Sequence, residues 1–301
     1  MSERTERLSV FKTYKLYVGG KFPRSESGRV YEVTDGKNGD WLANAPLSSR
    51  KDGRDAVVAA RKAFGGWSGA TAYNRGQVLY RVAEMLEGRR EQFVREVADA
   101  EGIGRSKAAA VVDAAIDRWV WYAGWTDKIA QVAGGANPVA GPFFNLSTPE
   151  PTGVVTVLAP QESSFLGLVS VIAPVIASGN TVVVIASERA PLPALSLGEV
   201  LATSDLPGGV VNILSGKAAE IAPSLAAHQD VNGIDLTGTA ADLGLAKQLE
   251  IAAADNLKRV RRPRAAEDFT ADPGTDRLTY FLETKTVWHP TGSLGASGSS
   301  Y

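Results

Sequence analysis

The sequence predicts an α/β protein: a helical region followed by a parallel sheet with helices on both faces. Between Pro151 and Val260, short β-branched runs alternate with helical stretches. The runs Val154–Leu158 and Thr181–Ile185 are too apolar to have one face in water, which is typical of strands buried on both sides. This alternation implies βαβ crossovers and therefore a doubly wound parallel sheet.

The elements of this region, residues 151–260, follow one another at the spacing that a βαβ core requires. The predicted strands are Val154–Leu158, Thr181–Ile185, Val210–Leu214 and Val231–Leu236. The predicted helices are Phe165–Ala177, Pro191–Thr203, Ala218–Ala227 and Ala240–Ala254. We therefore expect four strand–helix units in succession.

Residues 1–150 are predicted to begin with a β-hairpin and to continue as helices. Tyr14–Val18 and Arg29–Val33 alternate apolar and polar residues, with glycine and serine turn residues between them, which favours a hairpin. Apolar residues then recur at helical spacing in three segments. These segments are Asp55–Phe64, Val78–Val97 and Lys107–Ile129.

The end of the chain has a different character. Lys258–Arg264 holds five basic residues in seven; it suits a solvated linker better than a phosphate grip, because no aromatic residues are interleaved. We therefore predict that residues 261–277 form a linker in place of the segment between the two flanking regions. Residues 278–289 alternate as an exposed strand does, and residues 290–301 are rich in glycine and serine and predicted to be disordered.

Composition excludes several classes of function. The formal charge of −1 and the isoelectric point near 6.2 provide no general attraction to nucleic acid or to an anionic membrane. The chain has no cysteine and two histidines, so disulfides, thiolate metal sites and a cysteine nucleophile are excluded. The polar start of the chain has no apolar core of the signal-peptide kind, and no run is long enough to span a membrane. We expect a cytoplasmic protein.

Three residues near the carboxyl ends of predicted strands are candidates for binding a dinucleotide. Glu188 follows the strand Thr181–Ile185, where a carboxylate can accept from a ribose hydroxyl, but a Ser-Glu pair at a helix start explains it equally well. Gly216 would let the backbone approach a ligand, although a structural turn is the simpler interpretation. Thr239 has a hydroxyl that can hold a phosphate or simply cap the following helix.

Several segments, in the same order and spacing, resemble the aldehyde dehydrogenase family. The resemblance covers about Leu16 to Leu257. Its most specific stretch is Ile172-Ala173-Pro174 through Ala177-Ser178-Gly179-Asn180-Thr181-Val182-Val183, and the others are Leu16 to Lys21, Trp67 to Leu86, Glu150 to Val155, Leu206 to Asn212 and Ala227 to Thr239. The resemblance implies a Rossmann-like fold, in which we expect no cofactor or at most weakened NAD(P) binding.

The departures from the family pattern bear on catalysis. Where the family has Pro-Trp-Asn-Phe-Pro, with an asparagine that stabilises an oxyanion, this chain has Pro160-Gln161-Glu162-Ser163-Ser164. Where the family has a lysine that holds the adenosine ribose, this chain has Ile185. Only Arg259 to Thr279 stand where the family has its general base and its whole catalytic domain, so the resemblance implies a chain without catalytic residues.

The segment from Tyr280 to Val287 resembles the C-terminal oligomerisation strand of the family. We therefore expect a non-catalytic subunit that assembles with an intact aldehyde dehydrogenase or with itself, as the degenerate C-terminal copy does in two-domain members. The candidate interface residues are Tyr280, Leu282, Thr284, Thr286 and Trp288. Two alternatives stay open: an oxidoreductase-like protein or sensor that still binds NAD(P) weakly through Glu188, Gly216 and Thr239, and a homodimer without any ligand.

Overall fold

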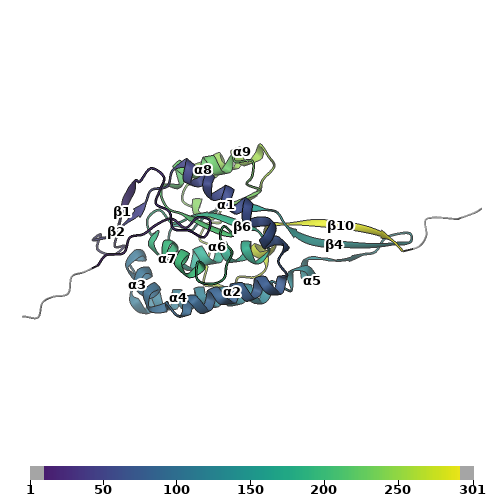
Figure 1. The fold of residues 1–301 in the computed structure, drawn as a ribbon, viewed down its shortest axis with the longest axis horizontal. Coiled ribbons are helices and arrows are strands. Elements are labelled where there is room, and N and C mark those ends of the chain that lie inside the picture. The colour runs from purple at the N-terminus through teal and green to yellow at the C-terminus, as the bar shows by residue number, and fades with distance from the viewer. Residues whose placement is uncertain (1–9, 292–301) are drawn as a thin grey trace, which may run out of the picture.

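The computed structural model describes residues 10–291 (Figure 1). The polar start of the chain and the tail from residue 292 onward lie outside the described residues. Pro290 is the last residue of a strand, so the predicted tail begins at least one residue later than expected.

The centre of the molecule is a parallel sheet of five strands. From one edge to the other they are β7 (Val211–Leu214), β6 (Thr181–Ile185), β5 (Val154–Leu158), β8 (Gly233–Asp235) and β9 (Arg259–Arg261). Within this sheet the chain first forms the central strand β5 and continues outward through β6 to the edge strand β7. It then crosses back to form β8 on the other side of β5. The first four strands were predicted, and β5 and β6 have the predicted bounds.

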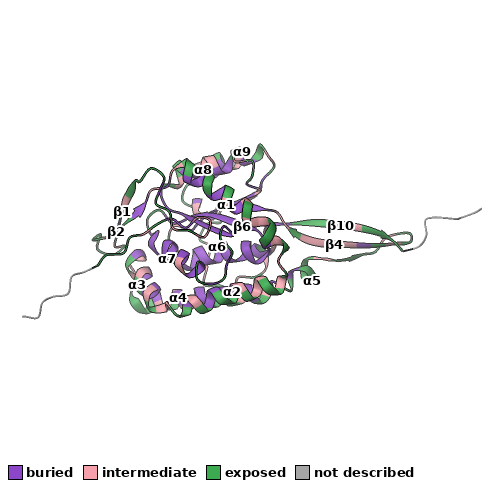
Figure 2. Cartoon of the chain, viewed as in Figure 1, coloured by how far each residue is buried: buried purple, intermediate pink, exposed green. Residues whose placement is uncertain are grey.

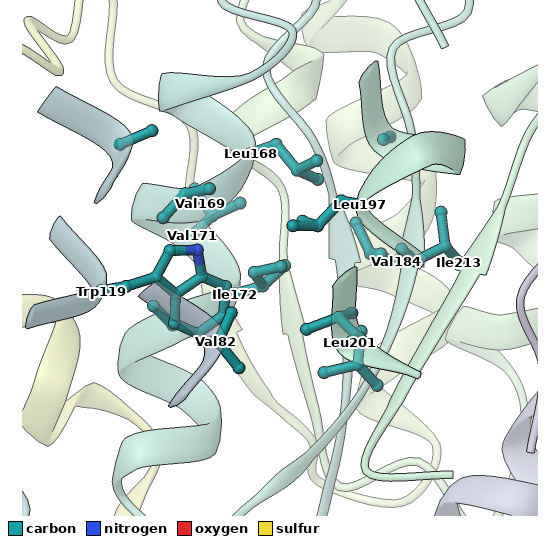
Figure 3. Close-up of a cluster of buried hydrophobic side chains, with 14 of the residues drawn as sticks. Val82, Trp119, Leu168, Val169, Val171, Ile172, Val184, Leu197, Leu201 and Ile213 are labelled. Atoms are coloured by element: carbon teal, nitrogen blue, oxygen red, sulfur yellow. The ribbon is translucent and has the colours of Figure 1, made fainter. Parts of the chain in front are cut away.

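Helices cover both faces of this sheet because the side chains of buried strands alternate between faces. Val155, Val157 and Val184 pack on one face against α6 (Leu166–Ala177) and α7 (Leu192–Leu201), as Figure 3 shows in part. Val183 and Ile185 pack on the other face. There they meet the helices α1 (Arg50–Gly69), α8 (Ala218–Ala226) and α9 (Leu243–Ala254). The predicted α/β fold class, with its parallel sheet and N-terminal helices, is confirmed.

A further layer of helices covers α6 and α7. It consists of α2 (Ala72–Glu87), α3 (Arg90–Glu101) and α4 (Arg105–Trp125), whereas the short α5 (Ile129–Ala133) contacts β3 and β4. The single helix predicted over Val78–Val97 is wrong, because the chain turns at Gly88 and Arg89 and begins a new helix. The helix predicted over Lys107–Ile129 likewise ends at Trp125. Among the described residues, no helix is both long enough and apolar enough to span a membrane.

The predicted N-terminal hairpin is also wrong in its pairing. β1 (Val30–Thr34) pairs in antiparallel fashion with β2 (Trp41–Pro46), not with Tyr14–Val18. Tyr17 instead forms a bridge to Ile213, with N···O distances of 3.1 and 2.7 Å. Residues 14–18 are therefore extended beside the outer strand of the main sheet, with the consecutive side chains of Leu16 and Tyr17 both buried.

A second sheet extends away from the body as a ribbon (Figure 1). Its order is β10 (Leu282–Pro290), β4 (Phe143–Pro151) and β3 (Gly135–Asn137), all antiparallel. The strand predicted over residues 278–289 is thus shorter at its start, because Tyr280 lies in the helix α10 (Asp276–Tyr280). We call β3, β4 and β10 the ribbon.

The prediction of a solvated linker at the basic run is wrong for residues 258–261, although Arg262 and Arg264 are exposed. Residues 259–261 form the fifth strand of the main sheet, and Arg261 and Lys258 are buried. Most of residues 262–276 are exposed, but Arg277 is buried between Asp235 and Glu267. Arg261 therefore belongs to a buried ionic cluster, whereas Arg262 and Arg264 are 79% and 63% exposed, and a count of basic residues does not distinguish the two environments.

Candidate functional site

The loops that follow β5, β6, β7 and β8 all lie at the carboxyl edge of the main sheet, where folds of this type bind ligands. The three candidate residues lie on these loops: Glu188 after β6, Gly216 after β7 and Thr239 after β8. The structure thus brings them to one edge, but it uses each of them differently.

The residues that follow β2, Leu47 and Ser48, pack against Gly216. Its φ of +126° favours glycine, and a Cβ there would lie 3.1 Å from Leu47 Cδ1 and 3.2 Å from the Ser48 nitrogen. The Ser48 N–H donates to the Ser215 carbonyl at 2.9 Å, and the Ser215 hydroxyl donates to the Pro46 carbonyl at 2.6 Å. The glycine therefore accommodates a neighbouring strand end, as the structural interpretation expects.

Glu188 is exposed, and its backbone N–H donates to Gln161 Oε1 at 2.9 Å. Ser187 does not start a helix: its hydroxyl donates to the Gln161 carbonyl and accepts from the Ala190 N–H, and α7 begins only at Leu192. The side chain of Gln161 thus ties the loop after β5 to the loop after β6. Its role was not apparent from the sequence, since the contact joins residues 27 positions apart.

Tyr31 is a second residue that the sequence did not single out at this edge. It lies on β1, and burial raises the pKa of its phenol, with a further increase from the nearby carboxylate of Glu188. The phenol also lies near the backbone of Gly216, but in a geometry that does not make a hydrogen bond. Tyr31 therefore occupies space between two of the three candidate residues.

Thr239 is buried, and its hydroxyl donates to the Leu236 carbonyl at 2.7 Å. It belongs to a single 3₁₀ turn, Thr237–Thr239, and does not cap α9, whose first turn is capped by Asp242. Gly238 packs so closely on the carbonyl of Ala159 that a Cβ would come within 2.2 Å of that oxygen. This close packing fills the space between β5 and β8, where the strand order of the sheet reverses.

Glu162, which stands in place of an oxyanion donor, is an exposed side chain. Its carboxylate pairs with Arg189 at 3.5 Å, across the ends of β5 and β6. Ile185 is buried on the face of the sheet that α1, α8 and α9 cover, so it presents no polar group to this edge. The carboxyl edge therefore offers two exposed carboxylates, Glu162 and Glu188, whereas the hydroxyl of Thr239 is engaged within the protein.

The interface candidates lie on or beside the ribbon. Leu282 is buried at its root, whereas Thr284, Thr286 and Trp288 are exposed along β10 (Figure 2). Tyr280 is not part of the strand; its hydroxyl donates to the Val260 carbonyl at 2.6 Å and anchors α10 to β9. Four of the five residues thus share one strand, and the fifth holds that strand to the body.

Residues 22–262 match the family model described as "Aldehyde dehydrogenase family". The chain belongs to the aldehyde dehydrogenase family. Aldehyde dehydrogenase, cytosolic 1, of Elephantulus edwardii is 32% identical over 252 residues, which are 82% of this chain and 49% of that protein. Retinal dehydrogenase 2 of Gallus gallus is 33% identical over 255 residues, 83% of this chain and 48% of its own length.

A solved structure of this family has the same fold. The NAD+ complex of the aldehyde dehydrogenase from Bacillus cereus matches with a TM-score of 0.78 at 27% identity, over 83% of this chain and 50% of that chain. The chain thus spans about half the length of the relatives it matches. The family match ends at residue 262, before the ribbon strand β10, so the resemblance of that strand to the family's oligomerisation strand stays a prediction.

Proposed function

We propose that this aldehyde dehydrogenase family chain is a non-catalytic subunit that assembles through β10 with an intact aldehyde dehydrogenase or with a second copy of itself. The observation that carries the proposal is the exposed outer strand of the ribbon. Within residues 10–291, β10 pairs with β4 on one side and is the outermost strand on the other. Such a strand presents a row of backbone donors and acceptors that another strand can extend.

The pairing with β4 indicates which backbone groups are turned outward. The Thr152 N–H donates to the Phe281 carbonyl, and Pro149 and Pro151 have no N–H to give to β10. Since hydrogen-bonded pairs alternate along an antiparallel ladder, the residues that bond β4 are Phe281 and every second residue after it. The outward groups are then those of the interface candidates Leu282, Thr284, Thr286 and Trp288.

The ribbon also lacks a core of its own. Along β10, residues 283–286 and 288–290 are exposed, and Phe144 on β4 and Trp288 are 47% and 56% exposed (Figure 2). Trp288 contacts Phe143 edge to face, with ring centroids 5.8 Å apart. A narrow ribbon of this kind is marginally stable without further cover. A partner that adds a strand to β10 would supply that cover.

The test uses Thr286, whose backbone N–H is one of the outward groups. Thr286→Pro removes this donor without removing a backbone hydrogen bond to β4, but it also removes the hydroxyl that contacts Ser147 on β4. Thr286→Val is the matched control, because it removes the same hydroxyl and keeps the N–H. We expect light scattering and native mass spectrometry to detect an oligomer for the chain, alone or co-expressed with an intact aldehyde dehydrogenase of its own source. The proline variant should weaken association at least tenfold. Equal association of the two variants would refute pairing through β10.

The non-catalytic part of the proposal is supported by the sequence, which has no cysteine to act as the nucleophile of a thioester route. Glu162 supports it too, because a carboxylate repels a developing oxyanion and loss of one such donor already costs about 3 kcal/mol. We expect the purified chain to produce no NAD(P)H from short-chain aldehydes. Turnover that co-purifies with the chain and scales with its concentration would overturn this part, while leaving the assembly test unaffected.

NAD(P) binding without catalysis is the second candidate, favoured by the exposed carboxylate of Glu188 at the carboxyl edge. The engaged hydroxyl of Thr239 and the closed surroundings of Gly216 argue for weak affinity at most. Ligand at 100 times its Kd would stabilise the chain by about 2.7 kcal/mol. A thermal shift with NAD+ or NADP+ that Glu188→Ala removes would establish this candidate, and the absence of a shift would exclude it.

A further inference from the structure

A cavity of about 210 Å³ lies where residues 261–277 pack on the helices α4 and α6. Its inner wall carries Arg118 and Tyr122 from α4 and Ser170 from α6, all three of them buried. Arg261 and Arg277 complete this wall, while exposed residues of the loop, among them Asp268 and Asp272, form the outer part. The loop that follows the end of the family match at residue 262 thus forms one side of a polar cavity.

Two hydroxyls in this wall have no hydrogen-bond partner within the described residues. They are the phenol of Tyr122 and the hydroxyl of Ser170, with their residues 0% and 1% exposed. Leaving a buried hydroxyl unpaired is costly, so such groups point to a missing partner. Other unpaired hydroxyls, such as those of Thr156 and Thr181, lie in strands of the main sheet and do not line this cavity.

The arginines of the cavity wall differ in whether a carboxylate pairs with them. Arg277 pairs with Asp235 at 2.8 Å and with Glu267 at 2.6 Å, and Arg261 pairs with Asp276 at 2.9 Å. Arg118 instead donates to the carbonyls of Phe269 and Ala271, at 2.6 and 3.1 Å. Among residues 10–291 it has no carboxylate within 4 Å. A buried guanidinium without a counter-charge is unusual, because an unpaired buried charge is strongly destabilising.

The nearby carboxylates do not supply this counter-charge. Asp268 accepts from the hydroxyl of Thr270 at 2.6 Å, and Asp272 accepts from the Gly274 N–H at 2.9 Å, so both hold turns of the exposed loop. Burial raises the pKa of the Tyr122 phenol to about 12, although the Arg118 and Arg277 guanidiniums act to lower it. The phenol therefore keeps its proton at neutral pH and can donate it. It makes no hydrogen bond of good geometry to Arg118.

We propose that this cavity binds a small carboxylate that accepts hydrogen bonds from Tyr122, Ser170 and Arg118. A carboxylate has two oxygens, each of which accepts more than one hydrogen bond, and its charge would balance the unpaired guanidinium. Since one water takes about 30 Å³ in the liquid, the cavity holds about seven non-hydrogen atoms. Acids of two to four carbons are of this size. The inference is independent of the proposed assembly function.

The test is a titration of the full chain with sodium acetate, propionate and pyruvate, at an ionic strength kept constant with sodium chloride. We expect at least one carboxylate to raise the Tm with a saturable dependence on concentration. Inorganic phosphate is run in parallel and should give no saturable effect beyond that of chloride. A response to phosphate alone would overturn the assignment to carboxylates, and no saturable response to any of these anions would overturn the site.

Substitutions in the cavity wall test whether the carboxylate that raises the Tm binds in this cavity. Ser170→Ala and Tyr122→Phe each remove one unpaired hydroxyl and should weaken carboxylate binding at least tenfold. Neither should lower the Tm in chloride alone, because each removes an unsatisfied buried group. Thr181→Val is the matched control: it removes an unpaired hydroxyl of the main sheet and should leave the titration unchanged. Unchanged titrations in both cavity variants would show that the anion binds elsewhere, and a Tm loss in chloride would show that these hydroxyls have partners within the protein.

Discussion

Replacement of Arg277 tests whether the segment after β9 is part of the folded core. Its guanidinium is 2.8 Å from Asp235 and 2.6 Å from Glu267, and it also donates to the Thr237 hydroxyl at 3.0 Å. The side chains of Arg277 and Asp235 are 8% and 1% exposed. Arg277→Met keeps most of the volume and removes the charge, so Asp235 is left buried without its main partner.

The expected cost follows from this burial. Breaking one partner of a buried ion pair costs about 3–5 kcal/mol. Arg261, whose Nε is 3.9 Å from the same Asp235 oxygen, offsets part of this, so we expect a loss near the lower end, ~3 kcal/mol. At roughly 2 °C for each kcal/mol in a chain of this size, the Tm should fall by about 6 °C. Urea unfolding followed by circular dichroism gives the free energy directly.

The double variant Asp235→Leu/Arg277→Met is the control. It removes both charges, and replacing a whole buried pair by apolar residues is often neutral or stabilising. We therefore expect the double variant to recover most of the loss of the single one. A single variant that costs under about 1 kcal/mol would refute the reasoning, since it would place the pair in water rather than in the core.

Three further predictions concern other parts of the chain. Gly153→Ala should destabilise by about 1–3 kcal/mol in urea, because φ is +139° and the new Cβ would meet Asn232 Oδ1 at 2.1 Å; a neutral result would contradict this backbone geometry. Ser49→Ala removes the side chain that caps α1 and should cost about 1 kcal/mol; Ser49→Asn is the control that should retain stability, because it caps without placing a charge beside the Glu26 and Asp52 carboxylates. Burial raises the pKa of Glu101 above its ordinary value, against hydrogen bonds from Ser164, so the folded chain binds this proton more tightly than the unfolded chain. Stability should therefore fall as pH rises through and above the usual glutamate range, and Glu101→Gln should remove that part of the pH dependence.

The main sheet was predictable because its strands are buried on both faces. Runs such as Thr181–Ile185 leave no polar residue to face water, and the helices between them are long enough for crossovers. The pairing of residues 14–18 was not predictable, since alternation indicates a strand without naming its neighbour. The basic run was misjudged for a similar reason: the acidic partner of Arg261 at 2.9 Å is Asp276, fifteen residues further along the chain.

The candidate site could be predicted from the sequence only to the same extent. The positions of Glu188, Gly216 and Thr239 at one edge follow from strand order, which the alternation of strands and helices implies. What surrounds them depends on contacts distant in sequence, such as that of Gly216 with Leu47. The alternation of apolar and polar residues predicted the exposed strand β10. It did not predict the partner strand β4, because Pro149 and Pro151 are typical of loops rather than of strands.

The ribbon leaves the body at the amino end of the main sheet, since β4 ends at Pro151 and β5 starts at Val154. The loops after β5, β6 and β8 lie at the opposite end. A nine-residue strand reaches about 30 Å, so a partner paired along β10 would sit well away from the carboxyl edge. The proposed assembly strand β10 and the candidate residues Glu188, Gly216 and Thr239 therefore lie at opposite ends of one sheet. If β10 carries assembly as proposed, substitutions at the carboxyl edge would leave the pairing strand unaltered, and a subunit of this design would keep its place in a complex while the residues at the other end change.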